Sequence, residues 1–306
     1  MMVVGIGQCC WDILALVESY PEADEKEEIR LLSEQGGGPV ATALVTLSRL
    51  GIPCRFHGIV GDDGYAALIR ESLAREGVDI TGLVTRGGAS SQVAFIVIER
   101  GNGRRTIFWQ RPTGQGLRPE ELAAGFLEGA EALYLDGLMT EVSRHALDEA
   151  RRRCIPVMVD AGRIRPGMMD LAARCDYLVA AERFFLDLGW DGTPEEFRRL
   201  ASGLGAPVVT VTRGAQGSLT WCGGEFFAVP ASAVEVVDTT GAGDVFHGGY
   251  LYGVLQEWKL HKTVTFASVV AALSCRGMGG RAGIPTLDEA VRVMGEGSFR
   301  ESADSP

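Results

Sequence analysis

The stretch Asp238-Thr239-Thr240-Gly241-Ala242-Gly243-Asp244 decides how this 306-residue sequence is interpreted. The apolar segment Val234–Val237, which we expect to be a strand, precedes it, and apolar residues recur at helical spacing from about Val245 onward. A glycine-rich turn at the start of a helix exposes backbone N–H groups at the positive end of the helix dipole, where phosphates bind. Asp244 stands beside that turn and can accept a proton. The stretch therefore has the two elements needed to transfer a phosphoryl group to an alcohol.

A short Gly-x-Gly-Asp sequence is often no more than a tight turn whose aspartate caps a helix. The full seven residues are more specific, because they resemble the C-terminal signature of the ribokinase (pfkB-type) carbohydrate kinase family, Asp-Thr-x-Gly-Ala-Gly-Asp. The resemblance extends from the first expected strand to about Pro285. It implies an enzyme that phosphorylates a sugar with ATP. Asp244 would be the catalytic base, and Gly241, Ala242 and Gly243 would form the turn that stabilises the transferred phosphoryl group.

Composition limits the possible partners and location of the chain. It is 46% hydrophobic, enough for one large core or two smaller ones, and its net charge is −11. An acidic chain is poorly suited to nucleic acid or an anionic membrane surface, so we expect neither partner. The seven cysteines contain no Cys-x-x-Cys pair, which favours a reducing cytoplasm over a disulfide or zinc framework. The first residues lack the basic region of a secretion signal, and no apolar run approaches the roughly 18 residues of a membrane span.

Apolar runs alternate with helix-like stretches along most of the chain. The expected strands are Val3–Ile6, Leu133–Leu135, Val157–Val159, Tyr177–Val179 and Val208–Thr212, and the expected helices are Thr42–Leu50, Tyr65–Glu76, Arg144–Arg153 and Pro194–Leu204. This alternation predicts an α/β fold with a central, mostly parallel sheet flanked by helices on both faces. The resemblance implies that the fold is ribokinase-like.

Two segments, residues 13–35 and 91–111, instead have the pattern of antiparallel strands, with a hairpin signal at Gly101-Asn102-Gly103. We expect them to form one small projecting β-sheet, which is either a lid over the crevice at the strand ends or a dimerisation flap; both roles are compatible. A homodimer through the lid is expected. The body would then comprise residues 1–12, 36–90 and 112–296, and residues 297–306 would be a loosely ordered tail.

The resemblance assigns sugar-binding roles near the N-terminus. The pair Gly37-Gly38 feeds a helix, as does the family's hinge between lid and body, and Thr42 occupies the position of a sugar-contacting asparagine. Asp12 follows the first expected strand, where the family binds sugar hydroxyls; a carboxylate can accept hydrogen bonds from two adjacent hydroxyls. The alternatives are an ordinary flexible turn and a helix-capping aspartate.

Nucleotide-binding roles are implied further along. The loop Thr212-Arg213-Gly214-Ala215-Gln216-Gly217 resembles the family's nucleotide loop, in which Thr212 and Arg213 would contact phosphate and Gly214 and Gly217 would allow close approach. A β-turn into a strand over Ser218–Trp221 is the alternative. The glycine-rich segment 277–283, with Gly279, lies where relatives close the adenine pocket. There they also bind a monovalent cation, so K⁺ is expected beside Asp238 and Thr240.

One departure from the family concerns Mg²⁺. The family often carries an Asn-x-x-Glu motif whose glutamate organises the Mg²⁺ water shell. Here Ala181 and Phe184 occupy the two positions, which leaves the neighbouring Glu182 as a substitute. The gap keeps open a non-catalytic sugar- or nucleotide-binding sensor on the same fold. The broken fingerprint Gly5-x-Gly7-x-x-Cys10 would favour a nucleotide-binding oxidoreductase. We expect His247 to be a packed or capping residue.

The flanks of the signature resemble the ketose kinases, nearest the sulfofructose kinase branch. This implies a fructofuranose-like substrate phosphorylated on a primary hydroxyl. Lys26, Arg30 and Arg111 of the lid are available to pair with an anionic substituent. However, the segment 136–139 after the strand Leu133–Leu135 lacks the arginine expected of an anion-binding branch, and a buried anion without a partner is costly. We therefore expect a ketose such as fructose, neutral or weakly acidic, rather than a sulfo- or phospho-sugar.

Overall fold

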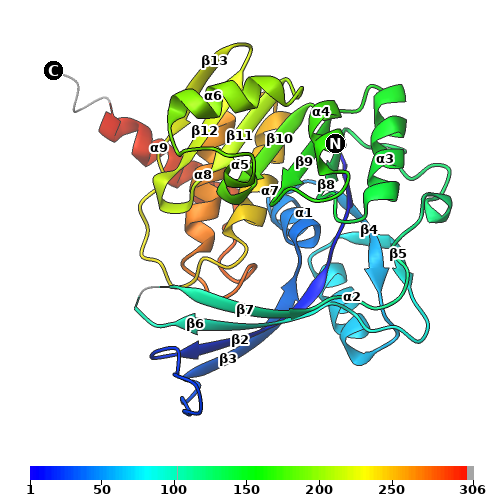
Figure 1. Cartoon of the computed structure of the whole chain (residues 1–306), viewed down its shortest axis with the longest axis vertical. Coiled ribbons are helices and arrows are strands. Elements are labelled where there is room, and N and C mark those ends of the chain that lie inside the picture. The colour runs from blue at the N-terminus through cyan, green and yellow to red at the C-terminus, as the bar shows by residue number, and fades with distance from the viewer. Residues whose placement is uncertain (102, 302–306) are drawn as a thin grey trace.

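The structure is a computed structural model that describes residues 1–101 and 103–301. A nine-stranded sheet forms its centre, with the strand order β13-β12-β11-β10-β9-β8-β1-β4-β5 (Figure 1). Its strands are β1 (Val3–Ile6), β4 (Cys54–Val60), β5 (Asp79–Thr85), β8 (Ala132–Leu135), β9 (Val157–Ala161), β10 (Tyr177–Ala181), β11 (Val208–Thr212), β12 (Ser218–Cys222) and β13 (Glu225–Val229). The strands from β5 to β11 are parallel to their neighbours, and β12 and β13 are antiparallel.

Helices cover both faces of this sheet, because side chains alternate along each buried strand and supply two separate cores. One core contains side chains from α1 (Pro39–Arg49), α2 (Gly64–Arg75), α7 (Ala242–Leu255), α8 (Leu260–Ser274) and α9 (Leu287–Glu301). The other contains side chains from α3 (Thr140–Arg152), α4 (Met168–Arg174), α5 (Glu182–Asp187) and α6 (Pro194–Gly203). The predicted α/β class and its parallel central sheet are confirmed.

A second sheet projects from the body (Figure 1) and has the strand order β3-β2-β6-β7. Its strands are β2 (Cys10–Val17), β3 (Leu31–Gly37), β6 (Val93–Glu99) and β7 (Arg105–Gln110). The two outer pairs are antiparallel, as expected, whereas β2 and β6 in the middle are parallel. They are parallel because both strands leave the body in the same direction. The sheet begins at Cys10 rather than residue 13, so Asp12 lies within it.

The strand expected over Val234–Val237 is wrong. Val236 and Val237 are 45% and 42% exposed. The N–H groups of Val237 and Asp238 both donate to the carbonyl of Cys275, at 2.8 and 3.2 Å. The segment is therefore held by the end of α8 and not by a neighbouring strand.

The C-terminal end also differs from expectation. Helix α9 continues to Glu301, so residues 297–301 of the expected tail are helical; residues 302–306 lie outside the described part of the chain. Two short 3₁₀ helices, η1 (Pro119–Glu121) and η2 (Gly214–Gln216), complete the elements. None of the described helices combines the length and the apolar character needed to span a bilayer.

Candidate active site

The N-terminus of α7 is the centre of the site. Gly241 precedes the helix with a φ of 70°, and a Cβ at this position would lie 2.7 Å from the Cα of Gly280. Only glycine tolerates both conditions. No side chain caps the helix. The N–H of Ala242 is partly used by Thr239 O at 3.3 Å, while those of Gly243 and Asp244 belong to a first turn that has no intrahelical acceptor. This turn is suited to binding an anion.

Asp244 lies in the same turn and is half-buried. Burial raises the pKa of its carboxyl to about 7, and the nearby Asp160 carboxylate adds to this increase. A carboxylate with a pKa near neutrality is well matched to general-base catalysis at physiological pH. The contiguous signature thus places a turn suited to an anion beside a carboxylate whose proton affinity suits the role predicted for it.

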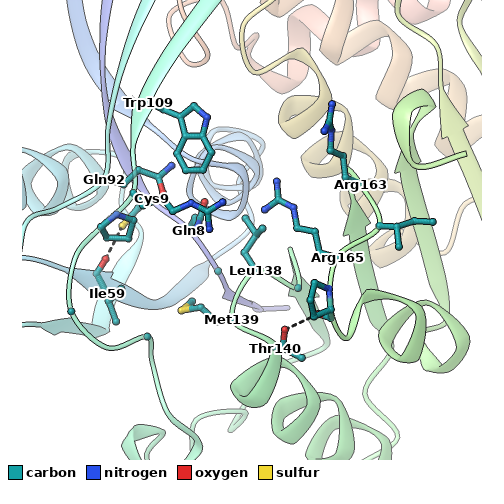
Figure 2. Close-up of a pocket in the computed structure, with 18 residues that line it drawn as sticks. Gln8, Cys9, Ile59, Gln92, Trp109, Leu138, Met139, Thr140, Arg163 and Arg165 are labelled. Carbon is teal, nitrogen blue, oxygen red and sulfur yellow. Dashed lines mark hydrogen bonds between the residues drawn. The ribbon is translucent and has the colours of Figure 1, made fainter. Parts of the chain in front are cut away.

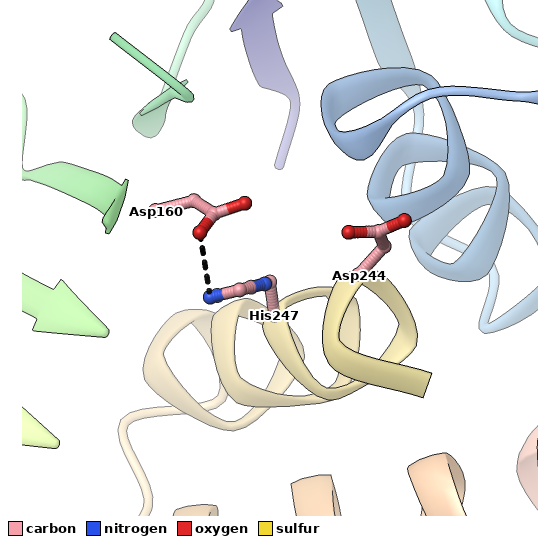
Figure 3. A group of neighbouring side chains, drawn as sticks. All are labelled: Asp160, Asp244 and His247. Atoms are coloured by element: carbon pink, nitrogen blue, oxygen red, sulfur yellow. Dashed lines mark ion pairs between the residues drawn. The ribbon is translucent and has the colours of Figure 1, made fainter. Parts of the chain in front are cut away.

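Asp160, at the end of β9, faces the same helix (Figure 3). Its Oδ1 lies 3.7 Å from Nε2 of His247, which is also 3.3 Å from the carbonyl of Val179. One ligand atom from each of Asp160, Asp244 and His247 lies within 4.8 Å of the others. Burial raises the pKa of Asp160 to about 7 and lowers that of His247. His247 is packed, as expected, but it packs directly against the site.

Asp238 joins the signature to the glycine-rich loop. It is almost fully buried. Its Oδ1 accepts from the N–H and hydroxyl of Thr240 at 2.9 and 2.8 Å, and its Oδ2 accepts from Gly279 N at 2.7 Å. These bonds bring three sequence-predicted residues together. They also hold the glycine-rich loop beside Gly241. Gly280 of this loop lies so close that a Cβ on Gly241 would be 2.7 Å from its Cα.

The predicted sugar-binding residues meet at the root of the small sheet. Asp12 is buried, accepts from Cys10 Sγ at 2.9 Å, and has a pKa raised by burial. A Cβ on Gly37 would lie 2.0 Å from Asp12 Oδ2, so glycine is needed there for the carboxylate to fit. Gly38 has a φ of 96° and directly precedes α1. The glycine pair therefore serves close packing as well as a change of chain direction.

Arg281 is a site residue that the sequence analysis missed. Its buried guanidinium donates to Ser72 Oγ at 2.8 Å, to Gly37 O at 3.2 Å and to Thr42 Oγ1 at 3.5 Å. It links the glycine-rich loop to the predicted hinge and engages Thr42 within the protein. The sequence shows Arg281 only as an arginine within the glycine-rich segment 277–283. It does not identify the partners of the Arg281 side chain.

The loop after β11 is a tight turn. Arg213 N donates to Gly217 O at 2.8 Å, and its Nη2 donates to Gln216 O at 3.1 Å, so this side chain is folded onto its own loop. Gly214 and Gly217 have φ values of 54° and 77°. Thr212 is the last residue of β11 and pairs with Ala181, the last residue of β10.

The Mg²⁺ position of the family is changed in structure as well as in sequence. Phe184 is completely buried in the core, whereas Glu182 is exposed at the first position of α5.

The small sheet supplies another residue that the sequence analysis missed: Arg105 of β7 donates to the hydroxyl of Thr239. The projecting sheet thus contacts the signature itself.

A cavity of about 1010 Å³ opens between the small sheet and the body (Figure 2). Trp109 and Arg111 line it from the sheet side, and the loops after β1, β8 and β9 line it from the body. Asp136 fixes two of these loops, because its Oδ2 accepts from Gln8 N at 2.7 Å and its Oδ1 from Leu138 N at 3.0 Å. Burial raises the pKa of Asp136 to about 7. Arg111 was predicted to bind substrate.

Comparisons with known proteins identify the family and the fold of the chain. The profile of the pfkB family carbohydrate kinases matches residues 1–287. The chain is 26% identical over 297 residues to the ATP-dependent ribose-1-phosphate kinase of Halopiger xanaduensis, covering 96% of this chain and 98% of that protein. It is 27% identical over 293 residues to the ribokinase of Bacillus subtilis, covering 94% and 98%. A ribokinase structure from Thermotoga maritima matches with a TM-score of 0.81 at 24% identity, covering 96% of this chain and 99% of that chain. The fold is ribokinase-like, and the chain belongs to the pfkB family of carbohydrate kinases.

Proposed function

We propose that this carbohydrate kinase transfers the γ-phosphoryl group of ATP to a primary hydroxyl of a small sugar, a ketose such as fructose or a derivative of one. The observation that carries the proposal is the half-buried carboxylate of Asp244 in the uncapped first turn of α7. The two relatives described above are named for a neutral and a phosphorylated sugar. Their names therefore leave the charge of the sugar open.

In the proposed reaction, the Asp244 carboxylate takes the proton of the sugar hydroxyl as that oxygen attacks the γ-phosphorus, and the bond to the ADP oxygen breaks. The N–H groups of Gly243 and Asp244 stabilise the charge on the transferred group. The sugar would lie against Asp12, Gly37 and Gly38. The ATP would lie toward Thr212 at the end of β11, toward Gly214 and Gly217 in the turn that follows it, and toward Gly279 in the loop after α8.

Mg²⁺ would neutralise charge on the phosphates during this transfer. Carboxylate oxygens are its preferred protein ligands, and Asp160 offers one beside Asp244, within the 4.8 Å cluster. Glu182 is exposed and is the weaker candidate. K⁺ would lie beside Asp238 and Thr240, where the remaining ligands would be carbonyls of the 277–283 loop.

An ADP-release assay over a panel of sugars tests this function. We expect turnover only with Mg²⁺, and a higher rate in K⁺ than in Na⁺ at equal ionic strength. The Asp160→Asn variant should require more Mg²⁺ for half-maximal rate than wild type, and Glu182→Gln should change this requirement less. Absence of sugar-dependent ADP release would contradict the kinase proposal, whereas equal rates in Na⁺ and K⁺ would contradict only the K⁺ site.

The small sheet is proposed to act as a lid, with residues 13–35 and 91–111 closing over the cavity, and to form a homodimer. The homodimer is supported by a group of exposed apolar side chains on the sheet: Leu31, Leu32, Phe95, Ile107 and Phe108. Mass photometry should give a dimer for wild type and a monomer for Phe108→Asp; a monomeric wild type would contradict the dimer. Cytoplasmic location is a proposal too, supported by seven free cysteines.

A further inference from the structure

The large cavity between the small sheet and the body is lined by positively charged side chains, which is unusual in a protein with a net charge of −11. Three arginines line it: Arg111 from the segment after β7, and Arg163 and Arg165 from the loop after β9. Among the described residues that line the cavity there is no aspartate or glutamate. The whole chain has 40 acidic and 29 basic residues, so this concentration of positive charge opposes the charge of the molecule.

None of the three arginines is used to pair with a carboxylate in the part of the chain that the structure describes, where ion pairs hold many other arginines. Arg111 lies over the ring of Trp109, with 5.0 Å from its Cζ to the ring centre, which leaves the edge of its guanidinium free to donate. Figure 2 shows Arg165 reaching into the cavity between Leu138 and Trp109.

Two acids near Arg165, Asp136 and Asp160, have a pKa that burial raises and that the charge of Arg165 lowers, but neither forms an ion pair with Arg165 in the described part of the chain. Both oxygens of Asp136 accept backbone N–H groups. Of the three lid cations named in the sequence analysis, Arg111 lines the cavity, whereas Arg30 pairs with Glu28 and Lys26 is exposed. Guanidinium groups are suited to the oxygens of phosphate, sulfonate and carboxylate, which they bind through paired N–H donors.

We infer that the sugar substrate carries an anionic oxygen-rich group, which Arg165, Arg163 and Arg111 bind in this cavity. This inference rests on the proposed kinase function and narrows its substrate. It departs from the neutral ketose expected from sequence. That expectation rested on the absence of an arginine from the loop after β8. Arg163 and Arg165 instead enter from the next loop, after β9, and add to Arg111, which the sequence analysis had already named.

Matched sugar pairs test the inference by steady-state kinetics: fructose against fructose 1-phosphate, fructose 6-phosphate and sulfofructose; ribose against ribose 1-phosphate; and glucose against gluconate. At least one anionic sugar should have a kcat/KM about 100-fold or more above that of its neutral partner. The members of the panel also distinguish phosphate, sulfonate and carboxylate. A neutral sugar within tenfold of every anionic one would overturn the inference while leaving the kinase proposal intact.

The variants Arg165→Gln and Arg163→Gln should raise the KM for the preferred anionic sugar about 10- to 100-fold each, without raising the KM for neutral sugars or ATP. Arg199→Gln is the matched control, because Arg199 is an exposed arginine of α6 that pairs with Glu196 within its own helix and lies outside the cavity. Equal effects on neutral and anionic sugars would contradict the assignment.

Calorimetric titration of the anionic sugars onto the enzyme with a non-hydrolysable ATP analogue separates the two hypotheses. Binding that Arg165→Gln weakens, without ADP release from ATP, would uphold the anion site and contradict the kinase proposal. If no anionic sugar binds more tightly than its neutral partner, the anion site is wrong, whatever the turnover.

Discussion

Replacing Asp244 with asparagine is expected to lower kcat by about 10²- to 10⁴-fold. Asparagine keeps the shape of the side chain but cannot take the proton of the sugar hydroxyl. Because the N–H groups of the α7 first turn remain, ATP and sugar should bind with nearly wild-type affinity. ADP release measures the first effect and calorimetric titration the second. A variant that retains more than half of the wild-type kcat would remove Asp244 from the role of base.

The proposed role of Asp244 as the base also predicts how kcat/KM depends on pH. The pKa of Asp244 is about 7, so kcat/KM of the wild type should rise with pH through that value and then level off. A rate that does not change between pH 5.5 and 8.5 would contradict this assignment.

The contribution of Asp244 to the free energy of unfolding should fall as the pH rises from about 4 to about 7, whereas kcat/KM should rise. A raised pKa in the folded state means that the native protein binds the proton more tightly than the unfolded chain does. The native carboxyl is therefore costly when ionised, at pH values above 7. Asp244→Asn should be more stable than wild type at pH 8, and this difference should shrink as the pH falls from about 7 toward 4. Thermal melts at the two pH values check the sign.

Most of the fold was predictable because its signal is local. The buried strands β1, β8, β9, β10 and β11 are short apolar runs, and helices of amphipathic pattern separate them. Strand β4 was missed, because Arg55 and His57 interrupt its apolar pattern. Val234–Val237 has the composition of a strand but bonds to Cys275, a partner that only the tertiary structure brings near. A strand needs a neighbouring strand as well as a suitable composition.

The candidate site also contains residues with a local sequence signal and residues that only the tertiary structure brings together. That Asp238, Gly241 and Asp244 lie together was predictable, because the turn, the helix start and the proposed base lie within seven consecutive residues. Asp160 and Arg165 were not, because each follows a different strand, and only the parallel sheet brings the ends of these strands to one edge. A sequence pattern finds functional residues when they are adjacent in the chain; side chains contributed singly by separate loops need the topology.

Alanine substitutions at two glycines of the signature should have different effects on stability and activity. The comparison separates the role of the turn in folding from its role in catalysis. Gly241→Ala places a Cβ 2.7 Å from the Cα of Gly280 at a residue with a φ of 70°. We expect it to lower the free energy of unfolding by about 1–3 kcal/mol and to lower kcat, because the turn must shift. Denaturant unfolding and ADP release measure the two effects.

Gly243→Ala should leave the fold intact and still impair catalysis. A Cβ at Gly243 meets nothing within 4 Å, and alanine in place of glycine within a helix is favoured by about 0.5–1 kcal/mol. The open space beside Gly243 is, in our proposal, where the transferred phosphoryl group approaches the N–H groups. A methyl group there should displace it and lower kcat/KM by up to about 10²-fold without lowering the melting temperature.

Gly64→Ala is the control for Gly243→Ala, because Gly64 also lies in the first turn of a helix with open space around it. It should gain similar stability and keep full activity. If both alanine variants are fully active, no phosphoryl group approaches the first turn of α7, and Asp244 would lose its reason to act as the base. If Gly243→Ala alone loses activity while both variants stay folded, the loss arises from the ligand that the turn binds, since the helix itself accepts alanine at either position.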